Sequence, residues 1–146
     1  KRKPMNEDIF VIGIDKVFNV VNTFESGNFS YIVNIIKDNK IIMQLIHGGL
    51  NEKINKKSFN FNYSISLNFY KEKEKQNKFE NLEISNEFDF YEYENVPSYI
   101  LNCKTNNEKT KEYLIIIIEK VYEYRRLDIF EFEIHQQPPM SQMIPS

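Results

Sequence analysis

The stretch from Ser58 to Tyr70 constrains the fold more than any other part of the sequence. It reads SFNFNYSISLNFY, with large apolar residues on one parity and short polar residues on the other. Side chains alternate between the two faces of a strand, so this spacing gives one apolar face and one polar face. A helix would scatter the same residues around its surface. The stretch therefore predicts a half-buried antiparallel strand whose Asn and Ser residues face solvent.

Other stretches repeat this period of two. Tyr31, Val33 and Ile35 share one parity of Phe29–Lys37, and Asp38-Asn39-Lys40 between this stretch and Ile41–Ile46 predicts a tight hairpin. Near the turn both arms carry apolar residues on both faces, so we expect this pair to be more deeply buried than the strand at Ser58 to Tyr70. The charged run Lys71–Lys78 has no apolar period and predicts an exposed loop. Apolar residues at strand spacing predict a strand or strand pair over Asp8–Val21. The same spacing predicts further strands over Phe79–Ile84, Glu87–Glu94, Ser98–Cys103 and Leu127–His135.

The stretch Glu112–Arg126, EYLIIIIEKVYEYRR, fits two structures. Leu114, Ile117 and Val121 form a helical stripe, and this alternative places one helix at about residues 109–125. Successive β-branched isoleucines lose side-chain freedom in a helix and suit a strand that is buried on both faces. On that ground we favour the strand.

About seven to nine short strands with little helix predict an all-β fold. We expect an antiparallel β-sandwich, with a small β-barrel as the alternative. The chain has 146 residues, which suits one domain, and we place it at residues 1–135. Residues 136–146 contain three prolines and no charge, and predict a flexible tail or linker.

Composition restricts the function. The net charge of −2 lacks the positive field of a general nucleic-acid binder, so nucleic acid ranks below protein and lipid as a partner. Cys103 is the only cysteine, which excludes an internal disulfide and suits a reducing compartment. No apolar run is long enough to span a membrane. We expect an intracellular, cytoplasmic protein.

From Phe10 to Tyr70, the order of features resembles a C2 domain. FVIGIDKVFNV is similar to the family's opening strand, FSYIVNIIKDNKI to its next hairpin, and NEKINKKSFNFNYS to the segment that enters a strand of alternating Phe. The resemblance implies a C2-like β-sandwich. Calcium-binding members use aspartates on two loops, whereas the corresponding segments here, NTFESGNFS and KEKEKQNK, contain no Asp. The resemblance therefore implies a calcium-independent member that binds protein, or lipid through basic residues.

Two sets of residues are candidates for binding. A cationic group on neighbouring loops suits anionic lipid head groups or phosphates, and consists of Lys37, Lys40, Lys53, Lys56 and Lys57. An aromatic group suits a protein interface, where Tyr is enriched, and consists of Tyr91, Tyr93, Tyr99, Tyr122 and Tyr124. The alternative for the first set is a solvated loop, and for the second it is ordinary packing.

No catalytic or metal-binding motif is present. GxSxG, GxGxxG, Walker and HExxH patterns are absent, and His47 and His135 have no neighbours at metal-ligand spacing. We therefore expect no cofactor, no metal and no enzyme. The sequence favours an interaction module that docks a protein partner, through a strand edge or an aromatic face, within a larger assembly. The alternatives are a peripheral membrane binder and an OB-type barrel that binds, or assembles on, single-stranded nucleic acid.

Overall fold

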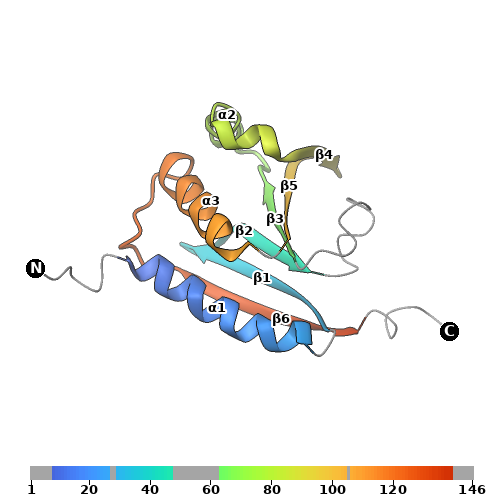
Figure 1. Ribbon diagram of the computed structural model, residues 1–146. Helices are drawn as coiled ribbons and strands as arrows, with labels where there is room; N and C mark the ends of the chain where they lie inside the picture. Colours follow the sequence, from blue (N-terminus) through green and yellow to red (C-terminus); the bar gives the residue numbers. More distant parts are fainter. Residues whose placement is uncertain (1–7, 27–28, 48–62, 105, 140–146) are drawn as a thin grey trace, which may run out of the picture.

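The computed structural model describes residues 8–26, 29–47, 63–104 and 106–139. Within them, the chain forms one open antiparallel sheet covered on one face by helices (Figure 1). The helices are α1 (Ile9–Ser26), α2 (Lys73–Glu80), the 3-10 helix η4 (Glu83–Glu87) and α3 (Asn107–Lys120). The strands are β1 (Phe29–Lys37), β2 (Lys40–His47), β3 (Tyr63–Asn68), β4 (Asp89–Tyr93), β5 (Val96–Lys104) and β6 (Glu131–Pro139).

The strand order across the sheet is β4-β5-β3-β2-β1-β6, and every neighbouring pair is antiparallel. After α3 the chain runs past the start of α1, where the Phe10 N–H donates a 3.0 Å hydrogen bond to the Arg126 carbonyl, and reaches the far edge of the sheet (Figure 1). There β6 pairs with β1. The predicted all-β fold is therefore wrong, because the chain combines helices with one sheet. The β-sandwich, which the C2 resemblance also implied, and the alternative barrel are wrong as well. The physical reason is that the inner face of the sheet is covered by helices rather than by a second sheet.

Two tight turns with positive φ angles join neighbouring strands of the sheet. Between β1 and β2, Asp38 and Asn39 have φ of 54° and 63°, as a two-residue type I′ turn requires. Between β4 and β5, Glu94 and Asn95 have φ of 51° and 67°. The predicted hairpin at Asp38-Asn39-Lys40 is confirmed, as are the strands within Glu87–Glu94 and Ser98–Cys103.

The organising stretch forms β3, in the middle of the sheet. Tyr63, Ile65 and Leu67 point into the core, as their parity predicts. Ser64 and Ser66 on the other parity are also buried, so their predicted exposure to solvent is wrong. A strand with neighbours on both sides buries short side chains between longer ones, which alternation alone does not reveal. Residues 58–62 of the predicted strand lie outside the described part of the chain.

Helix α1 replaces the strand predicted over Asp8–Val21. Its buried residues recur at helical spacing and pack on β1 and β6, while Ile12 and Val20 face outward. The strand interpretation used only the short alternation at the start of this segment. The helical period continues to Val21 and accounts for the buried set Phe10, Ile14, Val17, Phe18 and Val21.

Helix α3 occupies most of the ambiguous stretch, so the helical alternative is the correct one and the favoured strand is wrong. Leu114, Ile117 and Ile118 are buried on the side that faces the sheet and α1, whereas Ile115 and Ile116 are half-buried. Burial of that face outweighs the unfavourable helix propensity of isoleucine, which costs only a few tenths of a kcal/mol per residue, at most about 0.7.

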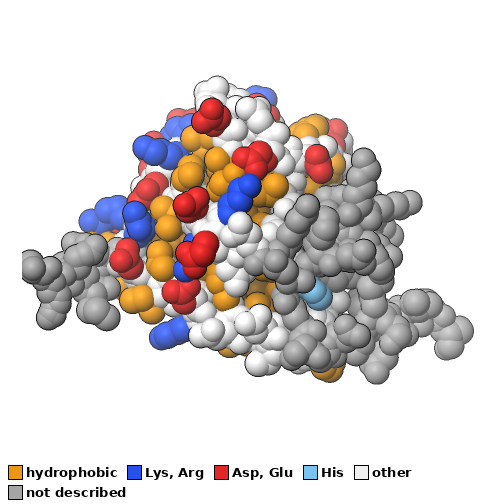
Figure 2. Space-filling model, viewed as in Figure 1, with side chains coloured by type: hydrophobic (Ala, Val, Ile, Leu, Met, Phe, Trp, Pro, Cys, Tyr) orange, Lys and Arg blue, Asp and Glu red, His pale blue; other side chains and the backbone are white. Residues whose placement is uncertain are grey.

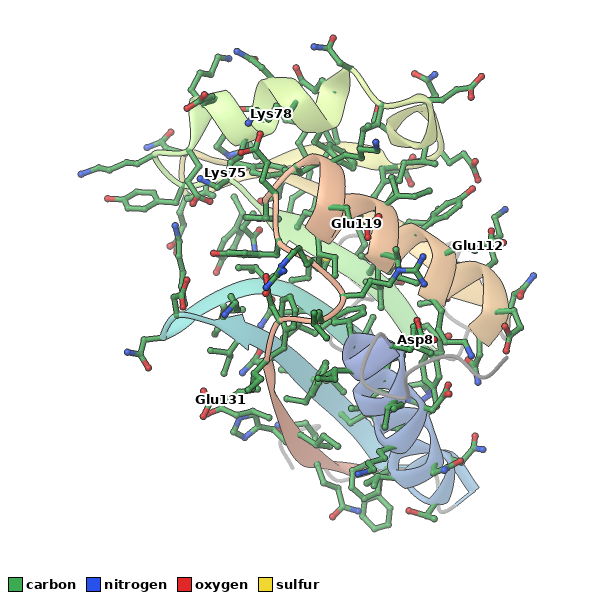
Figure 3. All side chains as sticks on the ribbon, turned by 90° about the vertical axis from the view of Figure 1, so that its left-hand side faces the viewer. Asp8, Lys75, Lys78, Glu112, Glu119 and Glu131 are labelled. Atoms are coloured by element: carbon green, nitrogen blue, oxygen red, sulfur yellow. The ribbon has the colours of Figure 1, made fainter. Side chains whose placement is uncertain are left out.

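Helix α2 and η4 occupy segments predicted as a loop and a strand. Only Gln76 and Phe79 of α2 are buried, which explains why no apolar period marks this helix. Lys75 and Lys78 project from α2 toward the end of α3 (Figure 3). There Lys78 Nζ lies 2.7 Å from a carboxylate oxygen of Glu123. These exposed contacts join α2 to the turn that follows α3, while the buried Phe79 packs α2 into the core.

The C-terminal strand β6 extends to Pro139 and pairs with β1 along its length. Its residues 131–135 fall within the strand predicted at Leu127–His135, and its residues 136–139 extend beyond that prediction. Residues 136–139 of the predicted tail thus belong to the sheet. The rest of that segment, residues 140–146, lies outside the described part of the chain.

Candidate functional site

Strand β4 forms one edge of the sheet and pairs only with β5. The backbone pattern of this edge follows from Pro97 in β5. The carbonyl of Pro97 accepts a 3.0 Å hydrogen bond from the Phe69 N–H at the end of β3, so Pro97 directs its backbone oxygen away from β4. Glu92, which lies opposite Pro97, is then in a pair without hydrogen bonds.

Antiparallel pairs alternate in type along a ladder. Tyr91 and Tyr93 therefore direct their backbone groups toward β5, and Phe90 and Glu92 direct theirs away from it. Each of these two outward residues presents one N–H donor and one carbonyl acceptor along the open edge. Within the described residues, no other strand pairs with this edge.

Aromatic side chains flank the edge. Phe90 is 56% exposed, and its ring lies 5.2 Å from the Tyr99 ring, centroid to centroid. Tyr93 is 62% exposed at the end of β4, and Tyr91 is half-buried. Large exposed rings on an unpaired strand are a common feature of protein interfaces.

The edge is acidic. The segment from residue 87 to residue 94 carries Glu87, Asp89, Glu92 and Glu94 and no basic residue. Charges on an edge strand also discourage pairing with identical copies, because like charges would meet. An oppositely charged strand would gain from the same field.

A pocket of about 290 Å³ lies where this edge begins. Glu87 at the end of η4 lines it on one side. The opposite walls come from β5 and from the first turns of α3, and include Leu101, Cys103, Asn106, Lys109 and Tyr113. The side chain of Asn106 accepts a 3.0 Å hydrogen bond from the Lys109 N–H and so caps α3.

Glu87 is held from two directions. The Tyr113 hydroxyl donates a 2.5 Å hydrogen bond to Oε2, and Lys109 Nζ lies 3.3 Å from Oε1. The hydrogen bond from Tyr113, with a smaller contribution from Lys109, lowers the pKa of the Glu87 carboxyl. Glu87 is therefore ionised at neutral pH, and the pocket contains a carboxylate in a defined position.

Cys103 lies on the core side of the pocket. Burial raises the pKa of its thiol to about 11, so it is neutral at physiological pH. A thiol that is both buried and neutral is a poor nucleophile and a poor metal ligand. Among the described residues, no group of three or more His, Cys, Asp or Glu side chains is placed to hold a metal ion.

The predicted cationic group is only partly described, because Lys53, Lys56 and Lys57 fall outside the described ranges. Lys40 forms an ion pair with Glu72. Lys37 lies 3.6 Å from Asp38, with its Nζ 5.6 Å from the centre of the Tyr124 ring. On the face seen in Figure 2, Lys and Arg side chains are interspersed with carboxylates.

The predicted aromatic group does not form one exposed surface. Tyr91 and Tyr93 lie on the β4 edge, but Tyr99 and Tyr122 are buried in the core. The Tyr122 hydroxyl donates a 3.2 Å hydrogen bond to the backbone carbonyl of Ile42. Tyr124 stacks on Tyr122 at a centroid distance of 6.2 Å, away from the edge. Only the first two tyrosines can therefore contribute to an interface at β4.

Sequence reasoning missed Phe90, Glu87, Lys109 and Tyr113 as site residues. The alternation over Glu87–Glu94 marked an acidic strand, but not that it forms an edge. Nothing local connects Glu87 with α3, since α3 was expected to be a strand.

Comparison with protein-family models, with curated proteins and with solved structures gives no match. No helix in the described ranges has the length and apolar character needed to cross a membrane. The site must therefore be interpreted from its own chemistry.

Proposed function

We propose that this chain is a protein-interaction module that binds an extended, basic segment of a partner protein by strand addition to β4. The observation that carries the proposal is the open backbone edge at Phe90 and Glu92. A peptide that pairs there gains main-chain hydrogen bonds, as in other cases of recognition by strand addition.

The side chains indicate the chemistry of the partner. Glu92, Asp89 and Glu94 supply negative charge without a nearby basic residue in β4, which favours lysine or arginine in the incoming segment. Phe90 offers an exposed ring for an apolar residue of that segment. The negative charge also ranks protein above anionic lipid and nucleic acid as the partner of this edge. Because the sequence has a single cysteine, we assign the interaction to a reducing, intracellular compartment.

A pair of variants at one position tests the backbone contribution. Glu92→Ala removes the charge but keeps the outward N–H, and Glu92→Pro removes both. Because this N–H points away from β5, proline leaves the β4–β5 ladder intact. The probe is a fluorescein-labelled nine-residue peptide that alternates lysine with valine and threonine (the probe peptide), and fluorescence anisotropy measures its affinity.

We expect Glu92→Ala to weaken binding moderately and Glu92→Pro to weaken it about 10-fold further, since one peptide hydrogen bond is lost and its partner group is left unpaired. Thermal unfolding checks that both variants fold. Equal affinities of the two folded variants, or no binding of the probe peptide to the unmodified protein, would contradict strand addition at β4.

A further inference from the structure

The pocket and the open edge are close neighbours along the chain, because Glu87, which lines the pocket, precedes β4. Glu87 lies two residues before Asp89, the first residue of β4, which corresponds to about 7 Å along an extended chain. A segment that pairs with β4 and continues beyond Asp89 in the direction of Glu87 approaches this wall of the pocket. One of its side chains is within reach of the Glu87 carboxylate.

The two contacts of Glu87 differ in strength. Tyr113 is buried, so its hydroxyl holds Oε2 from a fixed position in the core. Lys109, which contacts Oε1, has a side chain that is 50% exposed. An ion pair this exposed contributes little to stability, because solvent screens both charges. Oε1 is thus the oxygen at which another cation can replace Lys109.

We infer that the pocket receives a lysine side chain of the docked segment, whose ammonium group replaces Lys109 at Oε1 of Glu87. This inference rests on the proposed function and names the residue that the site selects. Lys109 marks the position of the incoming ammonium group, since it already makes the contact from within the chain.

The pocket matches lysine in three respects. Only one carboxylate oxygen is available, which suits a point charge better than the two-pronged guanidinium of arginine. The Leu101 side chain and the Tyr113 ring provide apolar surface for the lysine stem. The volume of about 290 Å³ accommodates one long side chain but not a folded element.

Two protein variants test the inference with effects of opposite sign. Glu87→Gln removes the carboxylate, and we expect the affinity for the probe peptide to fall about 10-fold, as for the loss of one charge-assisted hydrogen bond. Lys109→Gln removes the internal competitor, and we expect the affinity to rise by up to about 5-fold. Glu108→Gln is the matched control for Glu87→Gln, because both variants remove one negative charge. Glu108 is adjacent to Lys109 in the sequence, but its side chain does not line the pocket.

Peptide variants identify the residue that enters. Each lysine of the probe peptide is replaced in turn by norleucine, which keeps the stem and removes the charge, and then by arginine. We expect one position to dominate, to tolerate arginine less well than lysine, and to lose its effect in Glu87→Gln. Non-additivity of the peptide and protein changes then shows that the two groups are in contact.

The result separates this inference from the proposed function. Affinity that is insensitive to Glu87→Gln and Lys109→Gln, but is still reduced by Glu92→Pro, overturns the lysine pocket and leaves strand addition in place. Equal losses in Glu87→Gln and Glu108→Gln reduce the effect to general charge and also overturn it. A probe peptide that does not bind the unmodified protein overturns both.

Discussion

The hydroxyl of Tyr113 in α3 donates a 2.5 Å hydrogen bond to Oε2 of Glu87, which lies at the end of η4. This contact joins the helical layer to the start of the edge strand β4. It also favours the ionised form of the carboxyl, since it is the largest cause of the lowered pKa of Glu87. The position of one site residue and the pKa of its carboxyl thus depend on a side chain from a distant element.

Removal of this hydroxyl should raise the pKa of Glu87. In Tyr113→Phe the carboxylate loses its strongest donor, and Lys109 alone favours the charged form. We expect the ¹³C chemical shift of the Glu87 side-chain carboxyl to titrate at higher pH than in the unmodified protein. Tyr122→Phe is the control, because the Tyr122 hydroxyl donates to Ile42 instead. An unchanged titration of Glu87 in Tyr113→Phe would contradict the assigned cause.

The same contact has a consequence for stability. The pKa of Glu87 is lower in the folded chain, so its contribution to stability is present above the pKa of the unfolded chain and is lost as the pH falls through the folded value. The difference in free energy of unfolding between the unmodified protein and Tyr113→Phe should therefore be larger at pH 7 than at pH 2.5. Denaturant unfolding at the two pH values measures it. A difference that is constant with pH would show that the hydroxyl acts only through packing.

The helical nature of α3 predicts unequal roles for adjacent isoleucines. Ile117 is fully buried against the core and Ile116 is half-buried. We expect Ile117→Ala to lower the free energy of unfolding by about 2–5 kcal/mol, and Ile116→Ala by roughly 1 kcal/mol. Urea unfolding followed by circular dichroism gives both values. Equal, large losses would be the pattern of a strand buried on both faces.

How far the sequence predicts this fold depends on how specific each pattern is. Alternation over Tyr63–Asn68 and the turn at Asp38-Asn39 each fit only one local structure, and both were predicted correctly in position. The segment that forms α1 begins with an alternation that fits a strand, although its full length has a helical period. In α3, β-branched residues favoured a strand, but burial of one face against the sheet decided the outcome.

The site was less predictable than the fold, because it depends on contacts between distant elements. The acidic edge strand was visible in Glu87–Glu94, and Tyr91 and Tyr93 were assigned to an interface. The pocket needs Glu87 and Tyr113 side by side, and no local pattern connects them. Tyr99 and Tyr122 look like exposed tyrosines in the sequence, yet both are buried with their hydroxyls hydrogen-bonded.

A close approach between α1 and β6 predicts an unusual response at Gly13. A Cβ atom at this position would lie 2.5 Å from Cε2 of Phe132. In an ordinary helix interior, alanine in place of glycine stabilises by about 1 kcal/mol. Here the overlap with the ring should outweigh that gain, because overpacking costs about 1–3 kcal/mol. We expect Gly13→Ala to lower the midpoint of thermal unfolding.

The double variant isolates the cause of that loss. In the Phe132→Leu background the ring is absent, and Gly13→Ala should become neutral or stabilising. The effect of Gly13→Ala on the free energy of unfolding should therefore be more favourable in the Phe132→Leu background than in the unmodified protein. We expect this difference, which is the coupling energy between the two positions, to be about 1–3 kcal/mol. Additive effects would show that overlap with the Phe132 ring is not the cause of the loss.

Cys103 predicts a loss of stability at alkaline pH. Burial raises the pKa of its thiol from 9.0 to about 11, so the folded chain favours the neutral form. This contribution is fully present below about pH 9 and is lost as the pH rises through 11, a change of roughly 2–3 kcal/mol for a buried group. The Cys103→Ala variant has no group that titrates at position 103. Burial raises the pKa of Tyr99 to about 12, and Tyr99 titrates equally in the unmodified protein and in Cys103→Ala. The difference in free energy of unfolding between the two proteins should therefore shrink from pH 8 to pH 11 in denaturant titrations. A difference that does not change with pH would place the thiol in contact with solvent.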